Sequence, residues 1–321
     1  MKAKTIKSVL RNKHKAWLAT IQDEAVRELA KDGTIITGGA IASMLLREKV
    51  NDYDLYFRDR KTVVAVAGYY VKQFLKNPPS CFKHGGQVEI YLADGYGRQI
   101  DANHSAYDEK SSRVKVYVKS AGAASEDGTN SYQYFEAVPD PNSTDAHDYV
   151  EEAVAVVEES KEKDGKPEHR PVFLTANAIT LSGGIQIVTR FYGEPDVIHE
   201  KYDFVHCTNY WSSWNGVLCL RAAALESLLA RELRYVGSKY PLCSFIRTRK
   251  FVARQWTINA GQFLKMAMQL NDLDLTDMAV LEDQLTGVDA AYFMEVISAL
   301  KTRDDKKVDR AYLIELIDKI F

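Results

Sequence analysis

The sequence predicts an α+β protein with a mixed sheet at the front and an all-helical C-terminal part. Short β-branched runs alternate with segments of helical periodicity over roughly the first 80 residues. From residue 87 to about 138, β-rich runs parted by polar or glycine-containing turns indicate antiparallel strands within an insertion at about 85–170. After Trp214, apolar residues recur at helical spacing to the end. We therefore expect a domain at 1–214, carrying the insertion, and a helical domain at 215–321.

The first elements read as helix, strand, helix, strand and helix. Apolar residues at helical spacing from 18 to 29 predict a helix ending at Asp32-Gly33, where glycine can adopt the left-handed cap conformation. Residues 34–37 are all β-branched and predict a short strand that stops at Gly38-Gly39. The next expected elements are a helix at 40–47, a strand at 52–57 and a helix at 61–76.

Strands return after the helix at 61–76, and helices follow them. Candidate strands lie at 88–94, 113–119, 132–138, 172–181 and 185–191, with helices at 150–157 and 195–202. Gly183-Gly184 is expected to form a hairpin turn between the last two strands. The helical stripes of the C-terminal part are at 218–229, 263–270, 278–285, 293–300 and 313–320.

Composition excludes several classes of protein. An apolar fraction of 46% and a charged fraction of 27% are typical of a soluble globular protein. The formal charge of -2 means that any nucleic-acid contact must use a local patch. Four cysteines without a CxxC pair argue against a structural zinc site and a disulfide scaffold. No stretch approaches ~18 uninterrupted apolar residues, so we expect a cytoplasmic protein with no membrane partner.

Two aspartates on one strand form the candidate metal site. Side chains alternate along a strand, so Asp52, Asp54 and Tyr56 should share one face, while Tyr53, Leu55 and Phe57 face the core. Neighbouring carboxylates repel each other unless a cation lies between them. Oxygen ligands favour a hard divalent ion, so the expected cofactor is Mg²⁺, with Mn²⁺ as an alternative.

The glycine pair before the next helix is the candidate phosphate site. At Gly38-Gly39 the backbone N–H groups of a helix N-terminus should be exposed, and glycine lets a phosphate approach the backbone closely. The alternative is that Gly38-Gly39 is only a tight turn and that Asp52 and Asp54 lie on a solvated edge strand.

The stretch ITGGAIASMLLREKVNDYDLYF resembles the hallmark of the DNA polymerase β-type nucleotidyltransferase superfamily. That hallmark is a glycine pair followed, after one helix, by an apolar-flanked Asp-x-Asp. The resemblance implies a polymerase β-like catalytic domain in which Asp52 and Asp54 hold the metal. It also implies that Gly38, Gly39 and Ser43 contact the nucleotide phosphates.

The same resemblance implies a third carboxylate on a later strand, which activates the acceptor hydroxyl at the metal. Asp203, in the run KYDFV, is the best match, and the order of elements around it resembles that of phage and large-virus members. Glu89 and Asp101 are the rival candidates. A viral origin would place the protein in the host cytoplasm.

A basic stripe is expected on a helix of the C-terminal part. Arg247, Lys250 and Arg254 lie at i, i+3 and i+7, while Phe245 and Trp256 fall on the reverse side. The segment resembles the arginine-bearing helix of tRNA-processing members of the superfamily, which implies contacts with the triphosphate or with an RNA backbone. An ordinary solvated cationic face is the alternative.

The expected reaction is transfer of a nucleoside monophosphate from an NTP to an acceptor hydroxyl, with pyrophosphate leaving. An RNA 3′ end, as in tRNA, is the first choice of acceptor, because the basic stripe resembles that of RNA-processing members. A protein hydroxyl or a small molecule is the alternative acceptor. An inactive nucleotidyltransferase fold that serves as a binding module is the alternative to catalysis.

Overall fold

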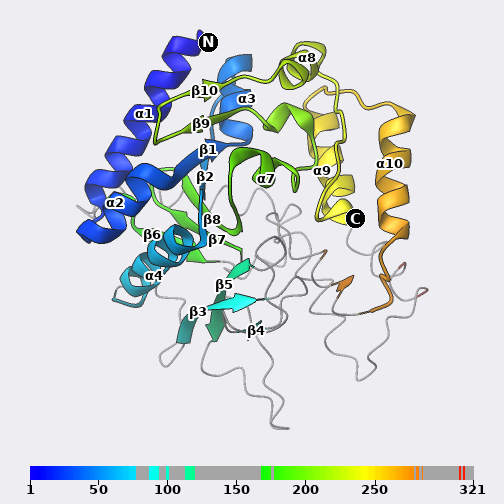
Figure 1. The fold of residues 1–321 in the computed structure, drawn as a ribbon. Coiled ribbons are helices and arrows are strands. Elements are labelled where there is room, and N and C mark those ends of the chain that lie inside the picture. Colours follow the sequence, from blue (N-terminus) through cyan, green and yellow to red (C-terminus); the bar gives the residue numbers. More distant parts are fainter. Residues whose placement is uncertain are drawn as a thin grey trace, which may run out of the picture.

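The computed structural model describes residues 1–76, 87–93, 99–100, 113–119, 168–174 and 177–277, with residues 280, 281, 284, 311 and 314 (Figure 1). Its helices are α1 (Ala3–Thr20), α2 (Glu24–Gly33), α3 (Gly39–Leu46), α4 (Arg60–Lys76), α7 (Pro195–His199), α8 (Ala222–Ala230), α9 (Pro241–Ala253) and α10 (Ala260–Asn271), with the 3-10 helix η1 (Val205–Cys207). No helix of this described part is long and apolar enough to cross a membrane.

A seven-stranded mixed sheet forms the centre of the protein, in the order β10-β9-β1-β2-β8-β7-β6. Its strands are β1 (Thr34–Thr37), β2 (Tyr53–Phe57), β6 (Pro171–Leu174), β7 (Ala178–Leu181), β8 (Ile185–Tyr192), β9 (Tyr210–Ser212) and β10 (Leu218–Cys219). β1 runs antiparallel to β2, with Thr37 opposite Asp54, and β8 runs parallel to β2, with Gln186 opposite Asp54. The expected mixed α/β organisation of the front half is therefore confirmed.

A second, three-stranded sheet has the order β4-β3-β5. Its strands β3 (Gln87–Ala93), β4 (Gln99–Ile100) and β5 (Arg113–Lys119) pair antiparallel, as expected for the start of the insertion. The expected strand at 132–138 and helix at 150–157 lie outside the described residues. The hairpin at Gly183-Gly184 is confirmed, because β7 and β8 pair antiparallel and both glycines have positive φ.

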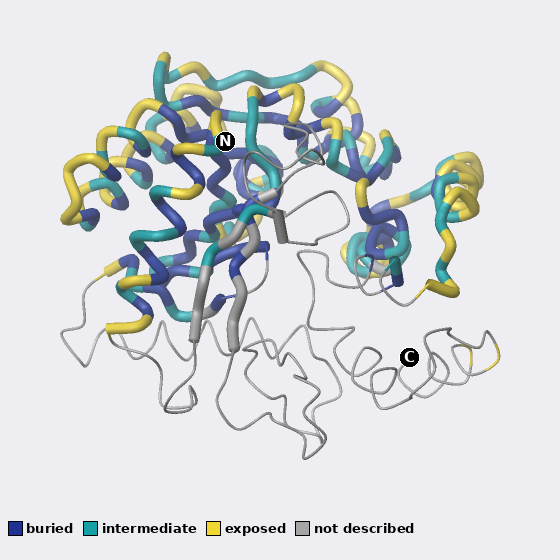
Figure 2. The backbone as a smooth tube through the Cα atoms, turned by 60° about the horizontal axis from the view of Figure 1, so that its bottom comes forward, coloured by how far each residue is buried: buried dark blue, intermediate teal, exposed yellow. Residues whose placement is uncertain are grey.

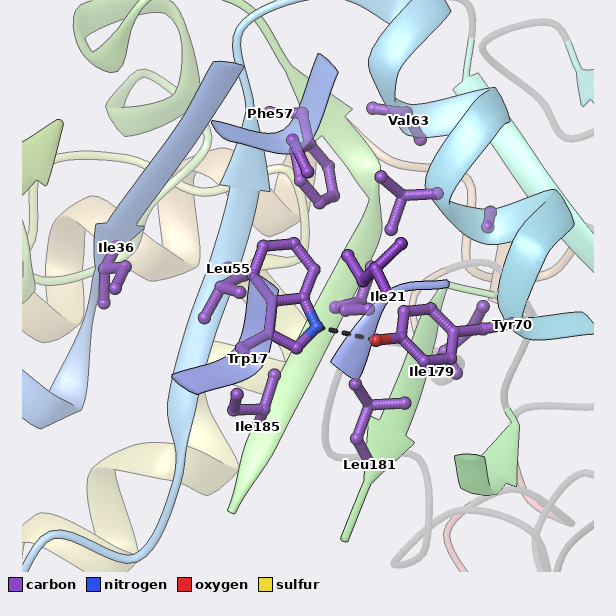
Figure 3. Close-up of a cluster of buried hydrophobic side chains, with 14 of the residues drawn as sticks. Trp17, Ile21, Ile36, Leu55, Phe57, Val63, Tyr70, Ile179, Leu181 and Ile185 are labelled. Atoms are coloured by element: carbon purple, nitrogen blue, oxygen red, sulfur yellow. Dashed lines mark hydrogen bonds between the residues drawn. The ribbon is translucent and has the colours of Figure 1, made fainter. Parts of the chain in front are cut away.

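One face of the large sheet carries the main apolar core. Helices α1, α2 and α4 bury their apolar sides against it, together with Leu55 and Phe57 of β2. Within this core the indole N–H of Trp17 donates a 2.7 Å hydrogen bond to the hydroxyl of Tyr70, so the one polar atom of each ring is satisfied (Figure 3). The strands are largely buried, while the outward sides of the surrounding helices are exposed (Figure 2).

The opposite face carries two smaller clusters. Tyr56 of β2 packs with Ile35, Val188 and Ile198. A third cluster joins Ala42 of α3 to Phe204 and to apolar residues from the segments around α8, α9 and α10. Alternation along β2 therefore follows the sequence pattern, since Leu55 and Phe57 lie on one face and Tyr56 on the other.

Three expectations about single elements were wrong. Gly33 ends α2 without a positive φ; a Cβ there would lie 3.3 Å from the side chain of Thr62, so its small size allows α2 and α4 to pack closely. Leu218 lies in β10 rather than in a helix, because this segment pairs with β9. Asp52 lies just before β2 rather than inside it. The expected helices after residue 277 lie almost wholly outside the described residues.

Candidate active site at the Gly38–Asp54 turn

Gly38 connects β1 to α3 in a conformation that favours glycine. Its φ of 92° and ψ of -150° lie in a region that L side chains rarely adopt. A Cβ at this position would lie 2.9 Å from Oδ2 of Asp54 and 3.8 Å from the hydroxyl of Tyr202. The backbone of the turn therefore lies next to the Asp54 carboxylate. The glycine pair and the Asp-x-Asp predicted that these two features lie close together.

Gly39 opens the N-terminal end of α3. It is exposed, and a Cβ placed on it would meet no heavy atom within 4 Å. The first N–H groups of a helix have no carbonyl partner within the helix, so a negatively charged group can bind there. The N–H of Gly38 is already used, because it donates a 3.1 Å hydrogen bond to the carbonyl of Cys207. A phosphate would therefore contact the first turn of α3 rather than Gly38 itself.

Ser43 lies one helical turn after Gly39 and is half-buried. Its carbonyl accepts a 2.8 Å hydrogen bond from the N–H of Glu48, which closes the end of α3. The expected contact between the Ser43 hydroxyl and a phosphate stays a prediction.

The two aspartates lie at the start of β2, with Asp54 inside the strand and Asp52 just before it. Asp54 is half-buried and Asp52 is exposed. Asp54 lies between Thr37 of β1 and Gln186 of β8 in the sheet register. β2 is a central strand of the sheet, so the two aspartates lie at the end of a strand beside the glycine turn and not on an edge strand.

Asp203 is buried and held from two sides. The guanidinium of Arg247 donates from Nη1 to its Oδ2, and the N–H of Phe204 donates a 2.9 Å hydrogen bond to its Oδ1. Its side chain is 7% exposed. The expected strand at this position was wrong, since Asp203 lies in a bend just before η1. Its backbone carbonyl instead accepts a 2.9 Å hydrogen bond from the N–H of Val236.

The electrostatic effects at Cys207 and Tyr56 show that these charges lie close together. Burial raises the pKa of the Cys207 thiol; Asp203 and Asp54 add to the rise, and Arg247 opposes it. Burial likewise raises the pKa of Tyr56, with Asp54 adding and Arg247 opposing. Both groups stay protonated near neutral pH. Asp54, Asp203 and Arg247 therefore all act on Cys207, whose carbonyl accepts the hydrogen bond from the N–H of Gly38.

The carboxylates fit a metal ion held together with substrate, but not one held by three carboxylates. Within the part of the chain that the structure describes, no group of three His, Cys, Asp or Glu side chains is placed to bind a metal. Mg²⁺ is commonly bound by one or two carboxylates plus the phosphates of a substrate. Asp52 is exposed and Asp54 half-buried, which suits that arrangement, while Asp203 is buried and paired with Arg247.

The basic stripe is only partly as expected. Arg247 and Lys250 lie on α9, and Arg247 reaches Asp203. Arg254 is exposed and lies just past the end of α9, so it is not part of the helix. Of the rival carboxylates, Glu89 lies on β3 in the separate sheet, and Asp101 lies outside the described residues.

A buried polar network, which no sequence pattern predicted, supports the turn from behind. The Thr37 hydroxyl lies 2.8 Å from Nε2 of His199 and donates a 2.9 Å hydrogen bond to the carbonyl of Asn209. Arg221 donates to Nδ1 of His199 at 3.0 Å, so Nε2 carries the ring proton and donates to Thr37. Burial, aided by Arg221, lowers the pKa of His199 to about 4.

Comparison with known proteins places most of this chain in a described family. A sequence profile with the description "Gabija anti-defense 2 family protein" matches residues 8–231. This range contains the glycine turn, both aspartates of the pair and Asp203, and it ends before α9. A protein of Bacillus phage SPbetaL7 described as "Gabija anti-defense 2" is 24% identical over 132 residues. The aligned part covers 41% of this chain and 32% of that relative, about a third of its length.

Proposed function

This chain belongs to the Gabija anti-defense 2 family, and we propose that it acts as a Mg²⁺-dependent nucleotidyltransferase in an anti-defense role. One observation carries the proposal. The Asp54 carboxylate lies directly over Gly38, at the entrance to a helix N-terminus whose first residue, Gly39, faces open space. Binding of a metal–triphosphate complex requires a carboxylate for the metal and backbone N–H groups for the phosphates. This turn offers both, and we call the N–H groups of the first turn of α3 the phosphate seat.

In this proposal, backbone N–H groups of the turn bind the phosphates and the carboxylates bind the metal. The first N–H groups of α3 hold phosphate oxygens of the NTP, and the open space at Gly39 admits them. Asp52 and Asp54 hold Mg²⁺, with Mn²⁺ as the alternative. When bound, this ion neutralises charge on the triphosphate and polarises the reacting phosphorus.

In the proposed reaction an acceptor oxygen attacks the α-phosphorus in line. The bond between the α-phosphorus and its bridging oxygen to the β-phosphate breaks, and pyrophosphate leaves with the electron pair. The acceptor hydroxyl gives up its proton to solvent water. The superfamily resemblance assigns base-side activation to Asp203, although here Arg247 holds that carboxylate. The chain's main contribution is then positioning and charge stabilisation.

The acceptor we propose first is an RNA 3′ end, because Arg247 and Lys250 place two positive charges on α9. A hydroxyl on a protein of the defence machinery is the alternative, favoured by the anti-defense name of the phage relative. Either acceptor would place the reaction in the host cytoplasm.

The test is to incubate the protein with Mg²⁺ and NTPs labelled on the α-phosphate, together with host RNA or host protein. Label is expected in one of the two fractions with wild type and in neither with Asp52→Asn or Asp54→Asn. Label that enters protein instead of RNA would change the acceptor but not the chemistry. Equal labelling by wild type and both variants, or no labelling by any of them, would contradict nucleotidyl transfer.

A second candidate function is binding without catalysis. It is favoured by the Asp203–Arg247 pair, which leaves no three-carboxylate centre among the described residues. The discriminating experiment compares phage plating on a host that carries Gabija, with wild-type protein or with Asp54→Asn. Full protection of the phage by Asp54→Asn would favour the binding function, and lost protection by a stably folded variant would favour catalysis.

A further inference from the structure

The Asp203 carboxylate is surrounded in a way that suits an ion pair better than a metal. One oxygen accepts from Arg247 and the other from the N–H of Phe204. The side chain is 7% exposed, and the backbone on its other side is fixed by the hydrogen bond from Val236. A metal ion would have to share this buried carboxylate with the Arg247 guanidinium and the Phe204 N–H, and the guanidinium charge beside it would repel the ion.

Arg247 is placed to act toward the turn. Its side chain is 26% exposed, against 7% for Asp203, so Arg247 is the more solvent-accessible member of the pair. Its positive charge acts on Tyr56 and Cys207. Cys207 accepts a hydrogen bond from the N–H of Gly38 and so touches the turn directly. Arg247 therefore pairs with Asp203 in the segment 202–207, which contacts the glycine turn through the Cys207 carbonyl and through the Tyr202 hydroxyl, 3.8 Å from a Cβ built on Gly38.

We propose that Asp203 is a positioning residue that holds Arg247 for the NTP triphosphate, and not a ligand of the metal. This inference rests on the proposed function. A guanidinium has five N–H donors in a fixed plane, so it can keep its bond to a carboxylate while it donates to phosphate oxygens. With Asp203 in place, α9 presents Arg247 in one orientation before the nucleotide arrives, which lowers the entropic cost of binding.

The experiment measures two equilibria on the full chain: binding of Mn²⁺ alone, and binding of the unreactive analogue α,β-methylene-ATP with Mg²⁺. Asp203→Asn keeps the shape of the side chain and removes its charge. It is expected to change the Mn²⁺ dissociation constant by less than about 2-fold and to weaken nucleotide binding by about 10-fold. Arg247→Gln should give the same pattern. Asp54→Asn, the matched control, should lose Mn²⁺ binding.

The double variant Asp203→Asn/Arg247→Gln separates positioning from a direct role. If Asp203 acts through Arg247, the double variant binds nucleotide no more weakly than Arg247→Gln alone. Arg247→Lys keeps a positive charge beside Asp203 and so controls for loss of folding. Its affinity for the nucleotide analogue should lie between those of wild type and Arg247→Gln. Loss of Mn²⁺ binding in Asp203→Asn but not in Arg247→Gln, or additive losses, would overturn the inference. Wild-type protein that binds neither probe would overturn the proposed function itself.

Discussion

The two faces of the seven-stranded sheet differ in what they bury. The face covered by α1, α2 and α4 is an apolar core in which Trp17 and Tyr70 satisfy each other. On the other face small apolar clusters surround buried polar groups, including Thr37, His199 and Asp203. Burying polar groups without full satisfaction is costly, and such groups cluster where function requires them. One sheet therefore combines an apolar, stabilising face with a face that buries polar groups beside the candidate site.

Acid should give the largest effect on stability, and it should act on both faces of the sheet. Burial lowers the pKa of His14, His199 and His206 to about 4, against about 6.5 in the unfolded chain. The unfolded state thus binds more protons below pH 6.5, so stability is fully present above that pH and is lost as pH falls toward 4. The loss is up to about 3 kcal/mol for each histidine. Urea unfolding between pH 7 and 4.5 measures it.

Substitution of single histidines shows how much of this loss of stability in acid comes from each face of the sheet. His14 lies beside Trp17 and Trp211 on the core face, and His199 lies behind the turn. His14→Gln and His199→Gln should each flatten the pH dependence relative to wild type. Unchanged slopes in both variants would show that these rings are not kept neutral by the fold.

Adjacent residues of β2 give the next test. Leu55 is 1% exposed in the core, so Leu55→Ala should reduce the free energy of unfolding by about 2–5 kcal/mol. Asp54→Asn should change it by less than about 1 kcal/mol while reducing nucleotidyl transfer by about 100-fold or more. Urea unfolding and label transfer measure the two effects. A large stability loss in Asp54→Asn would show that the carboxylate supports the fold rather than the reaction.

The glycine pair offers a matched comparison within the turn. Gly38→Ala would strain a φ of 92° and push against Asp54, at a cost of about 1–3 kcal/mol. Gly39→Ala meets open space, so stability should stay within about 1 kcal/mol of wild type. Its methyl group should still weaken nucleotide binding by filling the phosphate seat. Thermal unfolding and nucleotide titration separate the effects, and equal stability losses in both variants would contradict this geometry.

Substitution of the two threonines of β1 gives the smallest expected difference in the free energy of unfolding. Both are fully buried, with Thr34 facing the core side and Thr37 the site side. The hydroxyl of Thr34 donates only locally, to Ala30, whereas that of Thr37 joins His199 and Asn209. Thr37→Val should cost about 1–3 kcal/mol and Thr34→Val about 1 kcal/mol. A larger loss in Thr34→Val by urea unfolding would reverse the comparison.

Local pattern predicted the turn and the alternation of β2 because both depend on nearby residues. β-branched residues 34–37, the glycine pair and the spacing from Gly39 to Asp54 follow from rules that act over a few positions. Asp203 and Arg247, however, meet across 44 positions of chain. Their pairing, and that of Thr37 with His199, depends on tertiary packing that periodicity does not report.

The most direct test of nucleotidyl transfer at this turn follows both ends of the same nucleotide. Wild-type protein with Mg²⁺ and a host extract is incubated with NTP labelled on either the α- or the γ-phosphate. We expect α-label to become covalently attached to an acceptor and γ-label to leave as pyrophosphate, with both signals absent in Asp54→Asn. Release of γ-label as free phosphate without attachment of α-label, or signals that persist in Asp54→Asn, would contradict the proposed transfer.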